Sequence, residues 1–141
     1  MPRDRLTEHF ERDEFTCRHG LIGDEAAARE VCENLEALRA YLGGRPIEIV
    51  SGYRCLGCNQ AARGVKHSQH LLSKAADIRI KGLSVRDIAQ AIEELIAIGR
   101  MRQGGIGRYY RERGNRPAGF VHYDIRGTWA RWDNLLAGER G

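Results

Sequence analysis

The sequence predicts an α+β fold, in which helices flank a small, mainly antiparallel sheet. Two segments place apolar residues at helical spacing, and four shorter segments are apolar or alternate like strands. The predicted order is helix, strand, strand, helix, strand, strand. Because no internal repeat or low-complexity linker interrupts this order, we expect residues 1–141 to form a single domain.

The two predicted helices have clear start and stop signals. Asp24 is suited to cap the first helix, which ends at a pair of glycines. Its apolar residues recur at steps of four, three and four, and they would form one buried stripe: Val31, Leu35, Leu38 and Leu42. Ser84 and Asp87 open the second helix in the spacing of a capping box, and Gly99 ends it.

Four segments have strand character. "PIEIVSGYR" alternates Ile47 and Ile49 and then becomes a loop, whereas "AADIRIKG" is typical of a buried strand. "GGIGRYY" and "GFVHYDIRG" are predicted to be two further strands, joined by an arginine-rich turn. Phe10 and Phe15 are expected to attach the N-terminal segment to the rest of the domain.

Composition limits the class of protein. A chain of 141 residues with 42% hydrophobic and 30% charged residues is typical of a globular protein. No apolar stretch approaches the roughly 20 residues of a membrane span, and the charged N-terminus lacks the apolar core of a signal peptide. We therefore expect cytoplasmic synthesis, no membrane span and a monomer.

The chain is mildly basic, with a net charge of +4 and a pI of about 9.1. Residues 100–116 contain six arginines and one glutamate. Arginine with tyrosine suits phosphates and bases, so nucleic-acid binding is one interpretation. A solvated, glycine-rich loop is the simpler one, and weak attraction to polyanions such as bacterial wall polymers fits both. We expect no nucleic-acid partner.

Potential metal ligands are concentrated in "HSQHLLSKAAD" and "FVHYD". In an extended strand, His122 and Asp124 point to the same face. A catalytic zinc needs three ligands of the His, His, carboxylate type and an open position. His70, Asp77 and His122 would supply that set. The alternative is an ordinary hydrogen-bonded pair of His70 and Asp77 beside a half-buried His122, and spacing alone does not separate the two.

Several blocks resemble one enzyme family. "SGYRCLGCN", "SQHLLSKAADIRI", "GGIGRY", "FVHYDIRG" and the later Arg131-Trp132 pair are similar to peptidase family M15, the zinc D,D-carboxypeptidases and murein endopeptidases. The resemblance covers about residues 6–133, is closest to the short phage-type or YcbK-like branch, and implies the hedgehog/DD-peptidase fold. The family's core pattern falls on Ser68, His70, Ala75 and Asp77.

This resemblance implies a Zn²⁺ ion on His70, Asp77 and His122. It also implies that Arg54 binds a substrate carboxylate or polarises a substrate carbonyl, a role that suits the permanently charged, planar guanidinium group. The structural alternative for Arg54 is a salt bridge at the end of a strand.

Two further residues are candidates for substrate contact. Ser68 would otherwise cap or brace the loop before His70, and His67 would otherwise be an exposed loop histidine.

The chain departs from the family pattern at two positions. Ser73 replaces a usual glycine, and serine would be strained if that position needs a positive φ. Gly119 stands where many relatives have the general base, so Asp124 becomes the best candidate for a catalytic carboxylate. Asp124 would either take a proton or orient His122, and both roles remain open.

The cysteines raise a separate question. Cys17-x-His19 and Cys55-x-x-Cys58 have ligand types suited to a second, structural zinc. We rank free thiols first, a disulfide or structural metal clip second, and redox catalysis third, because no thioredoxin-like pattern surrounds them. Cys32 is expected to be a small core residue.

Two functions from different classes follow. The first is a zinc peptidase that hydrolyses peptidoglycan stem peptides, as a D-Ala-D-Ala carboxypeptidase or a murein endopeptidase. It would act on the wall after release or export, for example by a phage lysis system. The second is a non-catalytic wall-binding or scaffold module that keeps the fold and the metal. Gly119 favours the second, whereas the intact ligand set, Arg54 and Asp124 favour the first.

Overall fold

The computed structural model describes residues 4–61, 67–110, 112–113, 116–117 and 119–135. The elements in chain order are β1 (Arg5–Thr7), β2 (Phe10–Glu11), the 3₁₀ turn η1 (Arg12–Phe15), α1 (Glu25–Tyr41), β3 (Glu48–Ser51), α2 (Leu56–Ala61), the 3₁₀ turn η2 (Gln69–Leu72), β4 (Ala75–Arg79), α3 (Val85–Ala97), β5 (Gly105–Tyr110), β6 (Glu112–Arg113), β7 (Arg116–Pro117), β8 (Phe120–Asp124) and β9 (Ala130–Leu135).

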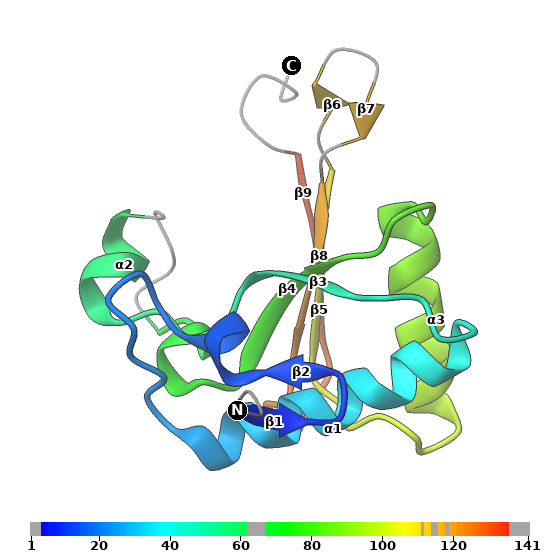
Figure 1. Ribbon diagram of the computed structural model, residues 1–141. Coiled ribbons are helices and arrows are strands. Elements are labelled where there is room, and N and C mark those ends of the chain that lie inside the picture. The colour runs from blue at the N-terminus through cyan, green and yellow to red at the C-terminus, as the bar shows by residue number, and fades with distance from the viewer. Residues whose placement is uncertain (1–3, 62–66, 111, 114–115, 118, 136–141) are drawn as a thin grey trace.

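The central sheet has the strand order β3-β4-β8-β5-β9. The first three pairings are antiparallel and the last, between β5 and β9, is parallel. Figure 1 shows α3 on one side of this sheet and α2 on the other. The predicted α+β fold with a small, mainly antiparallel sheet and flanking helices is therefore confirmed. Neither α2 nor β9 was among the predicted elements.

Both helices begin at their predicted caps. The Asp24 side chain accepts a hydrogen bond from the N–H of Ala27, and Ser84 and Asp87 form the reciprocal capping box of α3. The predicted stripe on α1 is buried at its first three positions, Val31, Leu35 and Leu38. Leu42 is only partly buried, because it caps the C-terminus of the helix rather than continuing it.

The core determines which face of β8 carries the polar side chains. Val121 and Tyr123 are fully buried in the main hydrophobic cluster together with α1 and α3 residues. Because side chains alternate along a strand, His122 and Asp124 face the opposite side of the sheet. The face of the sheet that carries His122 and Asp124 is thus the one away from α3 (Figure 1).

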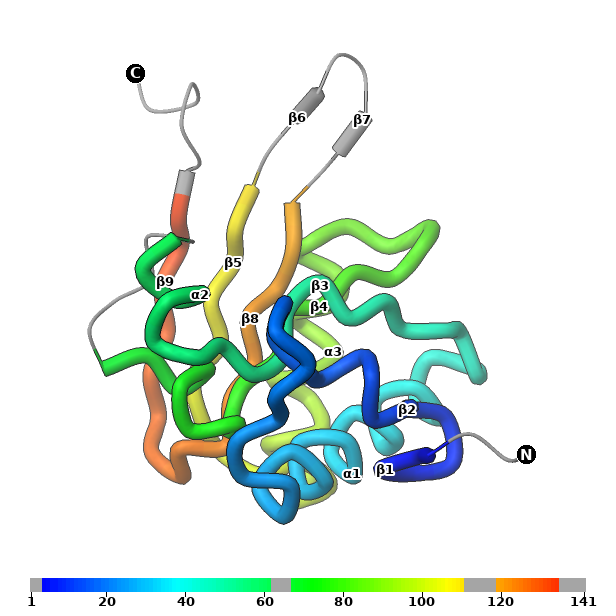
Figure 2. Tube along the Cα trace, turned by 60° about the vertical axis from the view of Figure 1, so that its left-hand side comes forward, coloured from blue at the N-terminus to red at the C-terminus, as the bar shows by residue number. Residues whose placement is uncertain are grey.

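The N-terminal segment is attached to the body as predicted. Phe10 and Phe15 are each 1% exposed and pack edge to face with ring centroids 6.0 Å apart. The Phe15 carbonyl accepts a hydrogen bond from Tyr53 in the loop after β3. A Cβ on Gly52 would lie 2.7 Å from the Phe15 Cα, so this approach needs glycine. Figure 2 shows the N-terminal segment passing in front of the sheet, beside the chain that leads to α2.

Part of the arginine-rich segment 100–116 lies outside the described residues. Of its described side chains, Arg102 forms an ion pair with Glu30, and Arg108 binds Asp133 with two hydrogen bonds of 2.6 and 2.8 Å. These carboxylates offset positive charge that a nucleic-acid surface would present to phosphates. In the part of the chain that is described, no helix has the length and apolarity to cross a membrane.

Candidate metal centre and active site

Two of the three predicted metal ligands are cross-strand neighbours. Asp77 on β4 is directly opposite His122 on β8 in the antiparallel register. His70 lies in η2, just before β4, and this short turn folds the imidazole back over the same face. The three side chains are buried, with exposed fractions of 2% for His70, 2% for Asp77 and 6% for His122. The predicted ligands therefore come together.

The spacing of these atoms fits a metal ion. Oδ1 of Asp77 lies 3.2 Å from Nε2 of His70 and 3.1 Å from Nδ1 of His122. A tetrahedral zinc with bonds of 2.0–2.2 Å would separate nitrogen and oxygen ligands by about 3.4 Å. Binding of a zinc ion would therefore require only a small outward movement of the three side chains.

The hydrogen bonds around the cluster direct three acceptors toward one point. Nδ1 of His70 lies 2.7 Å from the Gly52 carbonyl, and Nε2 of His122 lies 2.7 Å from Oδ2 of Asp124. Each neutral ring places its proton on this outer nitrogen, since an acceptor faces it there. The inner nitrogens then offer lone pairs toward the Asp77 carboxylate. Three acceptors facing one another need a cation, so the residues present fit a metal.

The ionisation of the cluster follows from its burial and its contacts. Where the inner nitrogens carry protons in place of a metal, burial alone would raise the pKa of Asp77, but the charge of His70 and hydrogen bonds from His122 and His70 hold it below its ordinary value. Burial lowers the pKa of His122, yet the hydrogen bonds to Asp124 and Asp77 outweigh this effect and raise it. A divalent ion bound here would replace the protons that otherwise balance these charges.

Asp124 lies behind His122 and is fully buried. Besides His122, it accepts hydrogen bonds from the N–H of Gly105 at 2.9 Å and from the Arg126 guanidinium at 2.7 and 2.9 Å. Burial raises the pKa of Asp124, but the hydrogen bonds from His122 and Arg126 outweigh it and lower the pKa below its ordinary value. Both carboxylate oxygens are thus engaged on the side of the imidazole away from Asp77.

Arg54 reaches the cluster from the loop after β3. Its guanidinium donates to Oδ2 of Asp77 at 3.1 Å and to the Ser51 hydroxyl at 3.2 Å. The Arg54 side chain is 18% exposed, compared with 3% for Asp77. The salt bridge of Arg54 is therefore made with the candidate metal site itself, and Arg54 is the more exposed partner.

Comparison with known proteins agrees with this geometry. A family model described as peptidase M15 matches residues 8–122, which is well over half of the chain and includes Arg54 and all three candidate ligands. The chain belongs to peptidase family M15. A curated relative, the "Probable peptidoglycan L,D-endopeptidase MepK" of Haemophilus influenzae, is 34% identical over 83 residues. The match covers 55% of this chain and only 38% of that relative.

The other two predicted site residues lie just before His70. The Ser68 hydroxyl accepts the backbone N–H of His70 at 3.1 Å and so caps η2. Ser68 is buried, whereas His67 is exposed. In this M15 chain, Ser68 therefore supports the turn that presents the first candidate ligand.

The structure accounts for both departures from the M15 pattern. Ser73 has a φ of 58°, the left-handed conformation that favours the family's glycine. Its hydroxyl donates to the Ile22 carbonyl at 2.5 Å and accepts the Asp24 N–H at 3.0 Å. At Gly119, a Cβ would lie 2.1 Å from the Tyr109 carbonyl oxygen, so a base at this position would require the backbone to move.

Trp132, part of the family resemblance, was not predicted to lie at the candidate site. It lies on β9 beside Gly107, and its ring centroid is 5.1 Å from that of His122. The indole N–H donates to the Tyr109 hydroxyl at 2.9 Å. A Cβ on Gly107 would lie 2.5 Å from the indole, so the glycine makes room for it. Trp132 thereby forms an aromatic wall next to the candidate metal ligands.

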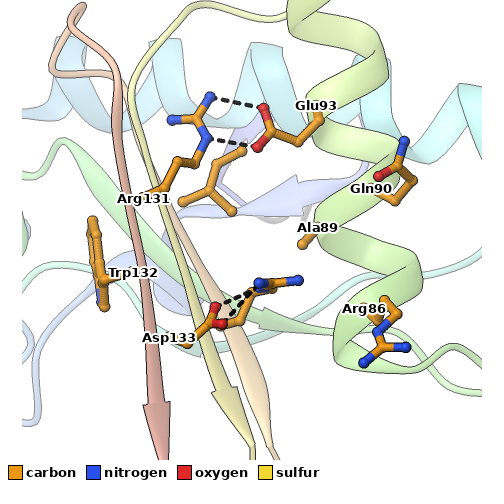
Figure 3. Close-up of a pocket in the computed structure, with 9 residues that line it drawn as sticks. Arg86, Ala89, Gln90, Glu93, Arg131, Trp132 and Asp133 are labelled. Atoms are coloured by element: carbon orange, nitrogen blue, oxygen red, sulfur yellow. Dashed lines mark hydrogen bonds and ion pairs between the residues drawn. The ribbon is translucent and has the colours of Figure 1, made fainter.

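A hollow between α3 and β9 lies on the other face of the sheet (Figure 3). Arg131 and Glu93 meet across it through two hydrogen bonds of 2.7 and 2.9 Å. Trp132 points away from α3, whereas Arg131 and Asp133 point toward the helix (Figure 3). The Arg131–Glu93 ion pair of this hollow joins β9 to α3 and is separate from the candidate metal site.

Proposed function

We propose that the chain is a zinc-dependent peptidase that hydrolyses peptide bonds in peptidoglycan stem peptides. The observation that supports it most strongly is the set of three buried acceptor atoms, His70 Nε2, Asp77 Oδ1 and His122 Nδ1, that face one another. Two imidazoles and one carboxylate form the ligand set of a catalytic zinc, with one position left open.

Each neighbouring residue has a role in this proposal. When bound, zinc would polarise a substrate carbonyl and provide a nucleophilic hydroxide at neutral pH. Arg54 binds the substrate carboxylate or stabilises the developing oxyanion, because its permanently charged side chain touches Asp77 and is the more exposed of the two. Asp124 holds the His122 ring so that Nδ1 faces the metal, since both of its oxygens are already engaged. Substrate contacts by Ser68 and His67 remain predictions.

The substrate class rests on family membership and on the relative. The Haemophilus influenzae protein is named as a peptidoglycan L,D-endopeptidase, which favours endopeptidase over D-Ala-D-Ala carboxypeptidase activity here. A net charge of +4 favours approach to anionic wall polymers. We expect the chain to act as a monomer on the wall after release or export, and a phage lysis system would be one setting.

A non-catalytic wall-binding module is the second candidate. Gly119 is the observation that favours it, because this position carries no side chain to accept a proton, and the backbone there leaves no space for one. Such a module would keep the fold and the metal and bind wall peptides without cleaving them.

Digestion of purified peptidoglycan, followed by mass spectrometry, tests the proposal. The zinc-loaded chain should cleave muropeptides, a chelator should abolish cleavage, and added zinc should restore it. Release of free D-Ala would identify a carboxypeptidase, and internal cleavage of stem peptides or cross-links would identify an endopeptidase. Zinc-loaded protein that binds peptidoglycan and leaves every muropeptide intact would contradict the peptidase proposal in favour of the binding module.

A further inference from the structure

A second group of metal-ligating side chains lies outside the candidate active site. Sγ of Cys17, Cys55 and Cys58 and a ring nitrogen of His19 all lie within 4.8 Å of one another. Three of the cysteines of the chain thus meet at one point, while Cys32 is fully buried in the core. All four cysteines are free thiols in the structure.

The distances match tetrahedral zinc. Nδ1 of His19 lies 3.4 Å from Sγ of Cys55 and 3.6 Å from Sγ of Cys58. With Zn–S bonds of about 2.3 Å and Zn–N bonds of about 2.0–2.1 Å, a tetrahedral ion separates sulfur and nitrogen ligands by about 3.6 Å. A disulfide between Cys55 and Cys58 would leave both Cys17 and His19 without a role, whereas a metal ion uses all four.

Two tight backbone turns present these ligands. Cys17 starts a turn in which its N–H donates to the Leu21 carbonyl and its carbonyl accepts from Gly20, so that His19 lies at the turn's tip. Cys55 precedes the first residue of α2, and its carbonyl accepts the N–H of Asn59 at 2.9 Å, which places Cys58 in the same helical turn. Cys-x-x-Cys is a spacing that structural zinc sites use, and Cys17 and His19 from the other turn complete a Cys₃His ligand set.

We propose that Cys17, His19, Cys55 and Cys58 bind a structural zinc ion. All four coordination positions come from the protein, so the ion has no open position and supports the fold rather than a reaction. Zinc binds the thiolates, and the thiol protons are released to solvent.

This ion would join two segments that are far apart in the sequence, the 17–19 turn and the start of α2. The six-residue α2 is far shorter than the roughly 12–15 residues that an isolated helix needs for marginal stability. Zinc would tie its first turn to the 17–19 turn. Arg54 immediately precedes Cys55, and Arg54, Cys17 and Cys58 line the same hollow. The structural ion would therefore hold the loop that presents Arg54 to the active site.

Metal content of the full-length chain tests the proposal. Protein purified with reductant and without chelator should contain two zinc ions per chain by elemental analysis. The double variant His70→Ala/His122→Ala should retain one. The double variant Cys55→Ser/Cys58→Ser should also retain one, and the matched control Cys32→Ala should keep two, since Cys32 lies away from both groups.

Cobalt(II) substitution gives a readout that does not depend on the cysteine variants folding. The His70→Ala/His122→Ala variant loaded with cobalt should show thiolate-to-cobalt charge-transfer absorption, which nitrogen and oxygen ligands do not produce. Zinc should also protect the half-buried thiols of Cys55 and Cys58 from alkylation, whereas Cys17 and Cys32 are buried in the structure itself. A wild-type cobalt spectrum without thiolate bands, or a Cys55–Cys58 disulfide in the reduced, zinc-loaded protein, would overturn the proposal. Because these readouts do not involve peptide cleavage, they stand whether or not the chain is a peptidase.

Discussion

Two ligand clusters of this molecule differ in how they are held. Asp77 and His122 lie on paired central strands, and the cluster that they form with His70 is buried. The cysteine cluster lies on two loops, with Cys17 buried, Cys55 and Cys58 half-buried, and His19 exposed. The first cluster is positioned by sheet register and the second by local turns.

The difference extends to what surrounds the ligands. In the strand cluster, the outer nitrogens of His70 and His122 have their own acceptors, the Gly52 carbonyl and Asp124. That arrangement presets ring orientation in a rigid part of the sheet, as a reactive metal requires. In the loop cluster, four ligands close around one point, as a purely structural ion requires. Paired strands thus suit a metal site that leaves one coordination position open, and loops suit a site in which the protein supplies all four ligands.

The largest expected effect comes from removing a strand-borne ligand. His122→Ala should lower the rate of peptidoglycan cleavage about 10³-fold or more, because a bound metal supplies several kcal/mol of transition-state stabilisation. The measurement is cleavage rate together with zinc content. His9→Ala is the control, since His9 pairs with Glu36 away from the site and should leave both values unchanged. Wild-type activity in His122→Ala would contradict the assigned site.

Arg54→Ala should have the next largest effect. It should reduce kcat about 10²–10³-fold, as loss of an oxyanion donor does, while the zinc content remains unchanged. Arg45→Ala is the control because Arg45 is exposed and lies before β3. An equal loss of activity and of bound zinc in Arg54→Ala would instead assign Arg54 to holding Asp77 in place.

Asp124→Asn distinguishes the two roles open to this carboxylate. If Asp124 orients His122, zinc affinity should fall about 10–100-fold, as measured by competition with a chelating dye. Asp133→Asn is the matched control, because Asp133 pairs with Arg108 on the helix face. Unchanged zinc affinity, together with loss of one limb of the pH–rate profile, would assign Asp124 to proton transfer.

Ser73 links the two regions and should give the smallest effect. Its hydroxyl joins the turn after His70 to Ile22 and Asp24, in the segment that follows His19. Ser73→Ala should destabilise the protein by about 1–3 kcal/mol, because the buried Ile22 carbonyl and the part-buried Asp24 N–H lose their partner. Ser73→Gly should be less harmful by about 1 kcal/mol, because glycine accepts a φ of 58° without strain. Denaturant unfolding of Ser73→Ala and Ser73→Gly measures the loss of unfolding free energy in each variant. Equal losses in the two variants would argue against backbone strain at position 73.

Sequence alone determined the parts of this protein that depend on neighbours along the chain. The caps at Asp24 and Ser84 and the buried stripe of α1 follow from local hydrogen bonding and helical period. The identity of the candidate ligands also came from the sequence, since spacing and family resemblance named His70, Asp77 and His122.

Only the tertiary structure decided how separate segments meet. Alternation along β8 left open which face is buried, and the packing of Val121 and Tyr123 against the helices settled it. The parallel pairing of β9 with β5 placed Trp132 beside His122. Cys17 and Cys55 are far apart in sequence, and the contact of the Phe15 segment with the loop after β3 brings them together. Such contacts depend on packing between distant segments, which local periodicity does not encode.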